Sequence, residues 1–119
     1  MSLKLRLKPH EKVLIGHAVV RNDDKAAVLH IENNVPILRE KDILKEEDAT
    51  TPERRLYFLI QLMYVDRDDL PRYLELFGEQ LMLVLAGNAG MGTELAALMK
   101  LVETRDYYNA LKMARLIMQ

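Results

Sequence analysis

Hydrophobic and polar residues alternate along roughly the first 40 residues of the chain. Leu3, Leu5 and Leu7 are separated by Lys4 and Arg6, which is the pattern of a strand with one buried face and one basic face. Further short aliphatic runs are separated by turn residues, and each run favours a strand. We therefore expect about five strands in an antiparallel meander or a small, partly open barrel, at residues 3–8, 12–16, 17–21, 25–32 and 35–38.

The hydrophobic period changes from two to about 3.6 residues after Asp42, which indicates helices from there to the C-terminus. The glycine-rich stretch 87–92 follows a helical pattern and lacks the Lys-Ser/Thr pair of a phosphate-binding loop, so it is interpreted as a helix–helix connection. The fold class predicted is α+β, with a β-rich part over residues 1–45 and a C-terminal bundle of about four helices over residues 50–119. The helices are expected at residues 50–65, 70–86, 93–103 and 106–119.

The first of these helices has the clearest beginning. Thr50 and Glu53 have the spacing of a capping box, and Pro52 suits the first turn. Apolar residues continue around most of the helix, so we expect it to lie at the centre of the helical part. Its most regular apolar stripe consists of Leu56, Leu59, Ile60 and Met63.

The length of 119 residues, half of them apolar, favours a single domain over residues 1–119 with one modest core. The chain contains no cysteine, which excludes disulfides and thiolate metal sites and is typical of a reducing compartment. The first residues alternate in polarity, and no apolar run reaches about 18 residues. We therefore expect neither a signal peptide nor a membrane span, and a cytoplasmic location.

Motifs for catalysis or metal binding are absent from the sequence. His10, His17 and His30 all lie in the β-rich part, and no two have the spacing of ligands on one helical face. His17 and His30 could be cross-strand neighbours, but structural or surface roles are favoured. There is no Gly-x-Ser-x-Gly elbow and no cysteine nucleophile. We therefore expect a protein that is not an enzyme and needs no metal or cofactor.

Positive charge is concentrated near the N-terminus, although the formal net charge of −1 excludes a uniformly basic nucleic-acid binder. The only acidic residue between positions 4 and 12 is Glu11. The four basic residues in this stretch form either a small binding patch or an ordinary solvated surface; they are Lys4, Arg6, Lys8 and Lys12.

Several segments, in this order along the chain, together resemble the flagellar biosynthesis repressor FlbT family. The chain opens with Leu-Lys-Leu-x-Leu-Lys-Pro from Leu3 and contains Ala-Val-Val-x-Asn from Ala18. Three longer segments are also similar, and the resemblance thus covers nearly the whole chain. These segments are residues 37–43, residues 51–58 with 61–64, and residues 106–111.

The resemblance implies a small cytoplasmic bacterial protein that acts on flagellin synthesis after transcription. Members of this family associate with the 5′ leader of flagellin messenger RNA and promote its decay or block its translation. They work alongside a second flagellin regulator, FlaF, and some members activate flagellum production instead of repressing it. The resemblance supplies no set of RNA-contacting residues.

Residues 10–16 and 35–40 also resemble two segments of the carbon storage regulator family, which are small β-rich RNA-binding repressors. The RNA-contacting arginine of the second segment corresponds to Arg39. The match departs from that family at three positions: His10 replaces a glycine, Leu38 replaces a histidine, and Leu7 stands at a basic position of the first strand.

An RNA-binding face can be predicted from the charge pattern and these resemblances. We expect the basic face of the first strand to meet the end of the last strand, by closure of a small sheet or across a dimer. Two arginines at the exposed start of the first helix are candidates for the same face, because guanidinium groups are rarely buried without partners. The alternative for the residues of the last strand is pairing with nearby acids. The complete set is Lys4, Arg6, Lys8, Arg39, Lys41, Arg54 and Arg55.

A rival hypothesis is a protein–protein adaptor without RNA contact. The helical part is rich in methionine, which could line an adaptable groove for flagellin or a co-regulator, although methionines at helical spacing are usually core residues. An apolar helical surface is also compatible with a homo-oligomer. The methionines concerned are Met63, Met82, Met91, Met99, Met113 and Met118.

Overall fold

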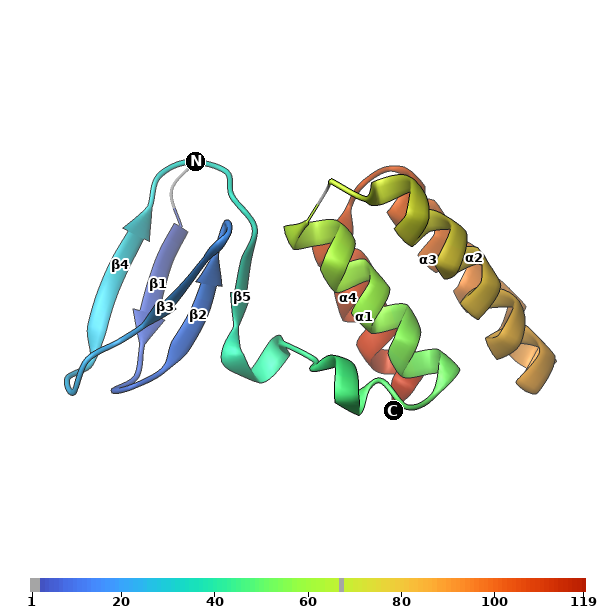
Figure 1. The fold of residues 1–119 in the computed structure, drawn as a ribbon, viewed down its shortest axis with the longest axis horizontal. Coiled ribbons are helices and arrows are strands. Elements are labelled where there is room, and N and C mark those ends of the chain that lie inside the picture. Colours follow the sequence, from blue (N-terminus) through green and yellow to red (C-terminus); the bar gives the residue numbers. More distant parts are fainter. Residues whose placement is uncertain (1–2, 67) are drawn as a thin grey trace. The chain divides into compact units, whose positions relative to one another are not determined.

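The structure of the chain is a computed structural model that describes residues 3–66 and 68–119 (Figure 1). Five strands come first and four α-helices follow, which confirms the predicted α+β class. The chain divides into two compact units, Met1–Ile43 and Leu44–Gln119, here called the β unit and the helical unit. The division falls just before the boundary expected between residues 45 and 50.

The β unit contains two small antiparallel sheets. β1 (Leu3–Leu7) pairs with β4 (Ala27–Ile31), and β2 (Lys12–Ile15) lies between β3 (Ala18–Arg21) and β5 (Ile37–Arg39). This order differs from that of a meander, in which each strand pairs with the next in sequence. The reason lies in residues 8–11: the N–H of Glu11 donates to the carbonyl of Lys8, His10 has φ 62°, and this turn leads the chain into a different sheet.

The predicted alternation of β1 is confirmed. Leu5 and Leu7 are buried, with 4% and 3% of their surface exposed, whereas Lys4 and Arg6 are exposed. Val13 of β2 is completely buried against the two leucines. Four partly buried side chains complete this small core: Ile15, Val20, Leu29 and Ile37.

The β2–β3 hairpin has a two-residue loop of Gly16 and His17, because Ile15 and Ala18 are paired. Gly16 has φ 60°, a conformation that glycine adopts without steric cost and that tight hairpin turns require. Pro36 immediately precedes β5, which is an edge strand of its sheet. A residue without a backbone N–H is tolerated at such an edge.

The helical unit consists of α1 (Pro52–Val65), α2 (Leu70–Gly87), α3 (Gly92–Glu103) and α4 (Tyr107–Met118). α1 packs against both α2 and α4, and α3 packs against α4 (Figure 1), so the central position predicted for the first helix is confirmed. The predicted apolar stripe of α1 is buried throughout. Short 3-10 turns η1 (Glu40–Asp42), η2 (Glu46–Asp48) and η3 (Ala89–Met91) connect the elements, and η3 lies in the predicted glycine-rich connection. No helix of residues 3–66 and 68–119 combines the length and apolar character needed to cross a membrane.

The start of α1 differs from the sequence prediction by one residue. The N-cap is Thr51, whose side-chain oxygen accepts a hydrogen bond from the N–H of Arg54 at 3.1 Å. A residue that precedes proline is driven into the extended conformation that an N-cap requires, and Thr51 has φ −123° and ψ 158°. The predicted capping box of Thr50 with Glu53 was therefore wrong.

One polar side chain is buried within the apolar surface of α1. Gln61 is only 7% exposed, and its amide makes two hydrogen bonds to the backbone of Leu44. Its oxygen accepts from the Leu44 N–H at 2.9 Å, and its nitrogen donates to the Leu44 carbonyl at 3.0 Å. Because both groups of the amide are satisfied, Gln61 fixes the segment before α1 without the cost of an unpaired buried polar group.

Candidate nucleic-acid interface

The outer face of the β1–β4 sheet carries the first part of the predicted site. Lys4 lies opposite His30 and Arg6 lies opposite Val28 in the antiparallel register, and all four side chains are exposed. Lys8 is exposed just beyond the end of β1. Directly opposite residues of an antiparallel pair point to the same side of the sheet. Lys4 and Arg6 therefore share one face with a histidine and an aliphatic side chain.

The cations of this face are not neutralised locally. In the part of the chain that the structure describes, no ion pair involves the side chains of Lys4, Arg6 or Lys8. The positions opposite Lys4 and Arg6 are not acidic. The face can therefore offer its positive charges to an external anion.

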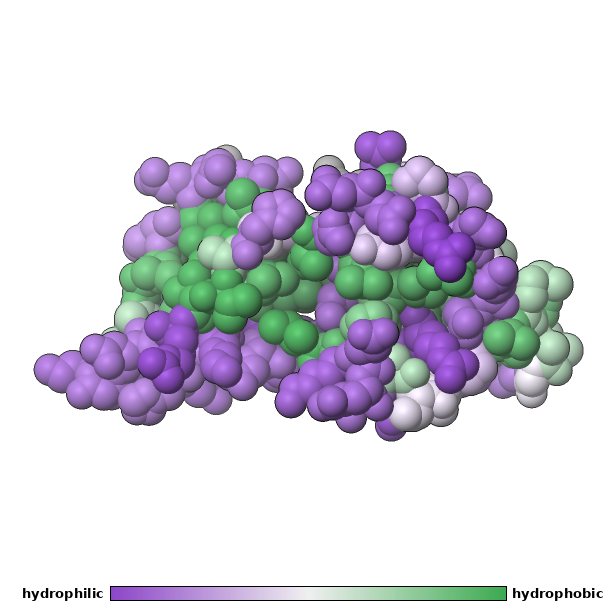
Figure 2. Space-filling model, in the orientation of Figure 1, coloured by the Kyte–Doolittle hydropathy of each residue, from purple (hydrophilic) through white to green (hydrophobic). Residues whose placement is uncertain are grey.

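Apolar side chains are also exposed on the β unit, and one of them, Val28, lies opposite Arg6. Figure 2 shows apolar side chains reaching the surface of the β unit, with hydrophilic residues around them. The large apolar side chains of this unit that are most exposed are Leu3, Val19 and Val28, at 48%, 74% and 49%. The β unit thus presents both cations and apolar groups to the solvent.

Arg39 is held in a hydrogen-bonded cluster that we call the Arg39 clasp, formed by Arg39, Glu11 and the backbone of Arg6 and Lys8. Nη1 of Arg39 lies 3.2 Å from Oε2 of Glu11, and Nη2 donates to the carbonyl oxygen of Arg6 at 2.6 Å. The other oxygen of Glu11 accepts from the N–H of Lys8 at 2.8 Å. The clasp therefore joins the end of β5 to β1 within one chain.

The partner of Arg39 is distant in sequence and differs from the nearby acids considered above. The side chains of Arg39 and Glu11 are 30% and 16% exposed, so the clasp is partly shielded from water. Glu40, the next residue after Arg39, instead accepts a hydrogen bond from the N–H of Lys12 at 3.2 Å. Lys41 is exposed in η1.

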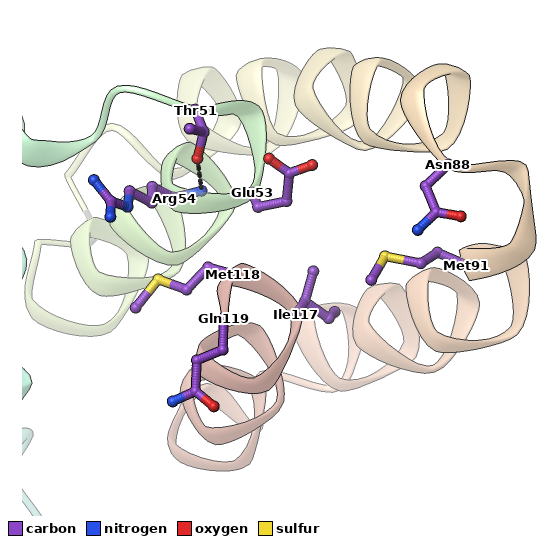
Figure 3. A pocket seen from close by; sticks show the side chains of 8 residues that line it. All are labelled: Thr51, Glu53, Arg54, Asn88, Met91, Ile117, Met118 and Gln119. Atoms are coloured by element: carbon purple, nitrogen blue, oxygen red, sulfur yellow. Dashed lines mark hydrogen bonds between the residues drawn. The ribbon is translucent and has the colours of Figure 1, made fainter.

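Arg54 and Arg55 belong to the helical unit and line two different hollows. Arg54 lines a pocket of about 410 Å³ together with residues of α4 and the α2–α3 connection (Figure 3). In that view its side chain extends away from Asn88 and Met91, and its Nη1 lies 3.4 Å from both the Asp48 carbonyl and the Thr50 hydroxyl. Arg55 lines a separate groove.

The groove beside Arg55 lies between α1 and α2 and has a volume of about 420 Å³. We call it the α1–α2 groove. Oε1 of Gln80, one of its lining residues, is buried and has no hydrogen-bond partner among the residues described. The hydroxyl of Tyr73, also in the lining, donates to Oδ2 of Asp66 at 2.9 Å, and this hydrogen bond raises the pKa of Tyr73. The apolar lining consists of Ala49, Phe58, Leu59, Leu62 and Leu76.

The methionines of the helical unit do not gather in one groove. Met63 is completely buried in the core, Met82 is 66% exposed, and Met91 and Met118 line the pocket of Figure 3. None of the residues that line the α1–α2 groove is a methionine. An adaptor role would therefore have to use leucine and phenylalanine side chains there.

Lys12, one of the four basic residues near the N-terminus, has a cationic neighbour that was not recognised from the sequence. Lys12 and Arg21 lie directly opposite each other in the β2–β3 hairpin, and both are exposed. Two like charges at directly opposite positions destabilise a sheet unless an anion accompanies them. The two-residue loop at Gly16 and His17 fixes this register, so recognition of that hairpin would have revealed the pair.

The histidines are far apart in the topology of the β unit. His17 lies in the β2–β3 loop and His30 pairs with Lys4 in the other sheet, so the cross-strand pairing of the two histidines considered above does not occur. Within residues 3–66 and 68–119, no group of three or more histidines, aspartates or glutamates is arranged to hold a metal ion.

Comparison with known proteins identifies the family. The family described as "Flagellar protein FlbT" matches residues 3–119. A "Probable flagellum biosynthesis repressor protein FlbT" from a Caulobacter species is 40% identical over 121 residues, which cover all of this chain and 92% of that protein. The "Flagellum biosynthesis repressor protein FlbT" of Caulobacter vibrioides is 37% identical, with 100% of this chain and 86% of the relative covered.

A third relative, the "Probable flagellum biosynthesis repressor protein FlbT 1" of Bradyrhizobium diazoefficiens, is 40% identical over 116 residues, which cover 97% of this chain and 79% of the relative. No solved structure matches the chain. The names of these relatives describe regulators of flagellum biogenesis. Since the family match extends over residues 3–119 and the relatives align along nearly the whole chain, the protein belongs to the FlbT family.

Proposed function

We propose that this protein regulates flagellum biogenesis by binding the 5′ leader of flagellin messenger RNA, and that binding represses translation or promotes degradation of the message. The regulatory role follows the names of its FlbT relatives. Direct RNA binding is supported mainly by the outer face of the β1–β4 sheet, where exposed cations have no acidic residue opposite them. We call Lys4, Arg6 and Lys8 the basic face.

The geometry of a strand suits contact with an extended RNA chain. Side chains two residues apart lie on the same side of a strand and are separated by about 6.6–6.8 Å. Lys4 and Arg6 have this spacing, and Lys8 follows directly after the end of β1. Cations in such a row contact phosphates without reading the sequence, and their binding weakens as salt rises.

The other residues of the predicted site have different proposed roles. Arg39 holds the backbone of Arg6 through the Arg39 clasp and so positions the basic face, while its partly exposed guanidinium remains able to contact RNA. Lys41 extends the positive surface from the end of β5. Arg54 and Arg55 belong to the helical unit and are further candidates for contact with the RNA.

The proposal is tested by fluorescence anisotropy with labelled flagellin 5′-leader RNA, a scrambled RNA of equal length and a series of salt concentrations. We expect preference for the leader and weaker binding as salt increases. Arg6→Glu should weaken binding by about tenfold or more at low salt, because it replaces a phosphate contact with repulsion. Arg72→Glu is the matched control, since Arg72 is exposed on α2 and the charge change is identical.

Equal binding of leader and scrambled RNA would contradict recognition of the leader. An equal loss of affinity in Arg6→Glu and Arg72→Glu would show that only net charge matters, and would contradict a role for the basic face. Melting temperatures of both variants provide the control for folding. Exposed positions of this kind usually change stability by no more than about 0.5 kcal/mol.

A second candidate function, an adaptor for a flagellar protein, is favoured by the α1–α2 groove. Its leucine and phenylalanine lining is suited to an apolar segment, and the unpaired Oε1 of Gln80 can accept a hydrogen bond from a bound partner. Binding of purified flagellin or a co-regulator, measured by calorimetry, tests this function. Leu76→Ala should weaken such binding, whereas Leu116→Ala, at a position 71% exposed on α4, should not.

A further inference from the structure

His30 is placed among the cations of the basic face. It lies directly opposite Lys4 and diagonally opposite Arg6 in the β1–β4 register. Cβ atoms of directly opposite residues are about 4.5–5.5 Å apart, and diagonal neighbours are about 7–8 Å apart. An imidazole ring at this position is therefore within side-chain reach of both cations.

The surroundings of His30 leave its ring available. The side chain is exposed, and the described part of the chain makes no hydrogen bond to it. The core of the unit is on the other side of the same strands, where Leu5, Leu7 and Leu29 face inward. Beside His30 on β4, two residues away and therefore on the same face, Val28 exposes 49% of its surface.

The presence of cations, an imidazole and an aliphatic side chain on one face favours one kind of RNA ligand over another. A duplex offers mainly phosphates and hydroxyl groups to a protein surface, whereas an unpaired segment also offers the faces of its bases. Cations alone can bind either kind of RNA through its phosphates. Planar side chains, including histidine, stack on unpaired bases, and an aliphatic neighbour adds apolar contact.

We infer that His30 stacks on an unpaired base of a single-stranded RNA segment whose phosphates are held by Lys4 and Arg6. The outer face of the β1–β4 sheet then binds single-stranded RNA in preference to duplex RNA. This inference rests on the proposed function, because it needs RNA at the basic face. It adds the class of RNA bound and a residue that contacts a base.

The test compares His30→Ala and His30→Phe with the unchanged protein, using leader RNA as a single strand and the same RNA annealed to its complement. His30→Ala should weaken single-strand binding by about five- to fiftyfold and should leave the weaker duplex binding almost unchanged. The slope of affinity against salt should stay the same, because stacking releases no counterions. His30→Phe should retain binding within about threefold, since it keeps a planar ring.

His17→Ala is the matched control, because it removes an exposed histidine from the β2–β3 loop, in the other sheet. It should leave affinity for both RNAs unchanged. Melting temperatures of all variants report whether they fold.

Three results would overturn the inference. If His30→Ala binds as tightly as the unchanged protein while Arg6→Glu is weakened, RNA binds the basic face without stacking on His30, and the proposed function survives. If His30→Phe is as weak as His30→Ala, or if His30→Ala lowers the salt slope, the imidazole acts through hydrogen bonding or charge. If neither Arg6→Glu nor His30→Ala affects binding, the proposed site fails together with this inference.

Discussion

The β unit and the helical unit differ in what fills their interiors. Of the eight largest fully buried side chains among the residues described, seven lie in the helical unit, and Val13 is the one in the β unit. Besides its small apolar core, the β unit has the Arg39 clasp, in which a partly buried ion pair and backbone hydrogen bonds join strands of its two sheets.

This difference explains how one short chain can carry both a stable scaffold and a charged surface. Burial of large apolar side chains stabilises helices that pack on several sides, as α1 does between α2 and α4. The β unit has sheets of only two and three strands, and the outer face of β1 is not needed for its core. That face can therefore carry cations. Four substitutions test this comparison, and they follow in order of expected effect.

Phe77→Ala should have the largest effect on stability. Phe77 is completely buried in α2, and truncation of a buried phenylalanine costs about 3–5 kcal/mol through lost apolar burial and the cavity that remains. Chemical denaturation followed by circular dichroism measures the change. Leu116→Ala, at a position 71% exposed, is the control and should cost less than about 0.5 kcal/mol. A cost below about 1 kcal/mol for Phe77→Ala would mean that the helical unit does not depend on this core.

Arg39→Ala should have the next largest effect and should act on the β unit. It removes the hydrogen bond to the Arg6 carbonyl and leaves Glu11 without its cation, at a cost of about 1–2 kcal/mol given the partial exposure. Arg39→Lys should recover little of this, because a single ammonium cannot reproduce the fork of the guanidinium. Hydrogen exchange of the β1 and β5 amides measures the loss. Equal protection in Arg39→Ala and in the control Lys41→Ala would contradict a structural role for the clasp.

Thr51→Ala should destabilise α1 by about 1 kcal/mol, because the N–H of Arg54 loses its capping oxygen. Thr50→Ala should cost only a few tenths of a kcal/mol, about the value of a weak exposed contact. Thermal unfolding of the two variants side by side compares the two positions directly. A larger loss of stability in Thr50→Ala than in Thr51→Ala would contradict Thr51 as the N-cap. It would favour Thr50, the cap predicted from the sequence.

Tyr73→Phe should have the smallest effect, about 0.5–1 kcal/mol near neutral pH, through loss of the hydrogen bond to Asp66. This bond raises the pKa of Tyr73 above its ordinary value of 10.0. Its stabilisation is therefore fully present below the pKa of the unfolded chain and is lost as pH rises through the higher pKa of the folded protein. The free energies of unfolding of Tyr73→Phe and the unchanged protein, measured by denaturation, should differ less above pH 10 than at pH 7. A difference independent of pH would contradict the assignment.

The sequence predicts much of the fold because the period of apolar residues can be recognised within a single stretch of chain. The alternation around Lys4 and Arg6, the five strands and the four helices all follow from periods of two and about 3.6. Pairing between distant strands produces no such local pattern. The sequence therefore could not predict that β1 pairs with β4 or that His30 lies opposite Lys4. The basic face itself was predicted, but its neighbours on the sheet were not.

Long-range hydrogen bonds also could not be predicted from local sequence patterns. Glu11 and Arg39 are 28 residues apart, and Gln61 and Leu44 are 17 residues apart. Gln61 occurs in an apolar helix, where its burial depends on a backbone segment that the helix pattern does not specify. Thr51 differs from these because the signal was local: Pro52 favours the extended conformation in the residue before it, and this restriction identifies the cap.

The proposed RNA binding depends most on the basic face, and one measurement tests this dependence most directly. Anisotropy titrations of flagellin leader RNA across a salt series should compare the triple variant of Lys4, Arg6 and Lys8 to alanine with a control triple variant of Lys45, Arg72 and Lys100, three exposed cations of the helical unit. Both variants lose the same charge. Loss of three contacts to a single strand should lower the salt slope by about 2 only in the first variant. Equal slopes and affinities in the two variants would contradict RNA binding at the β1–β4 sheet.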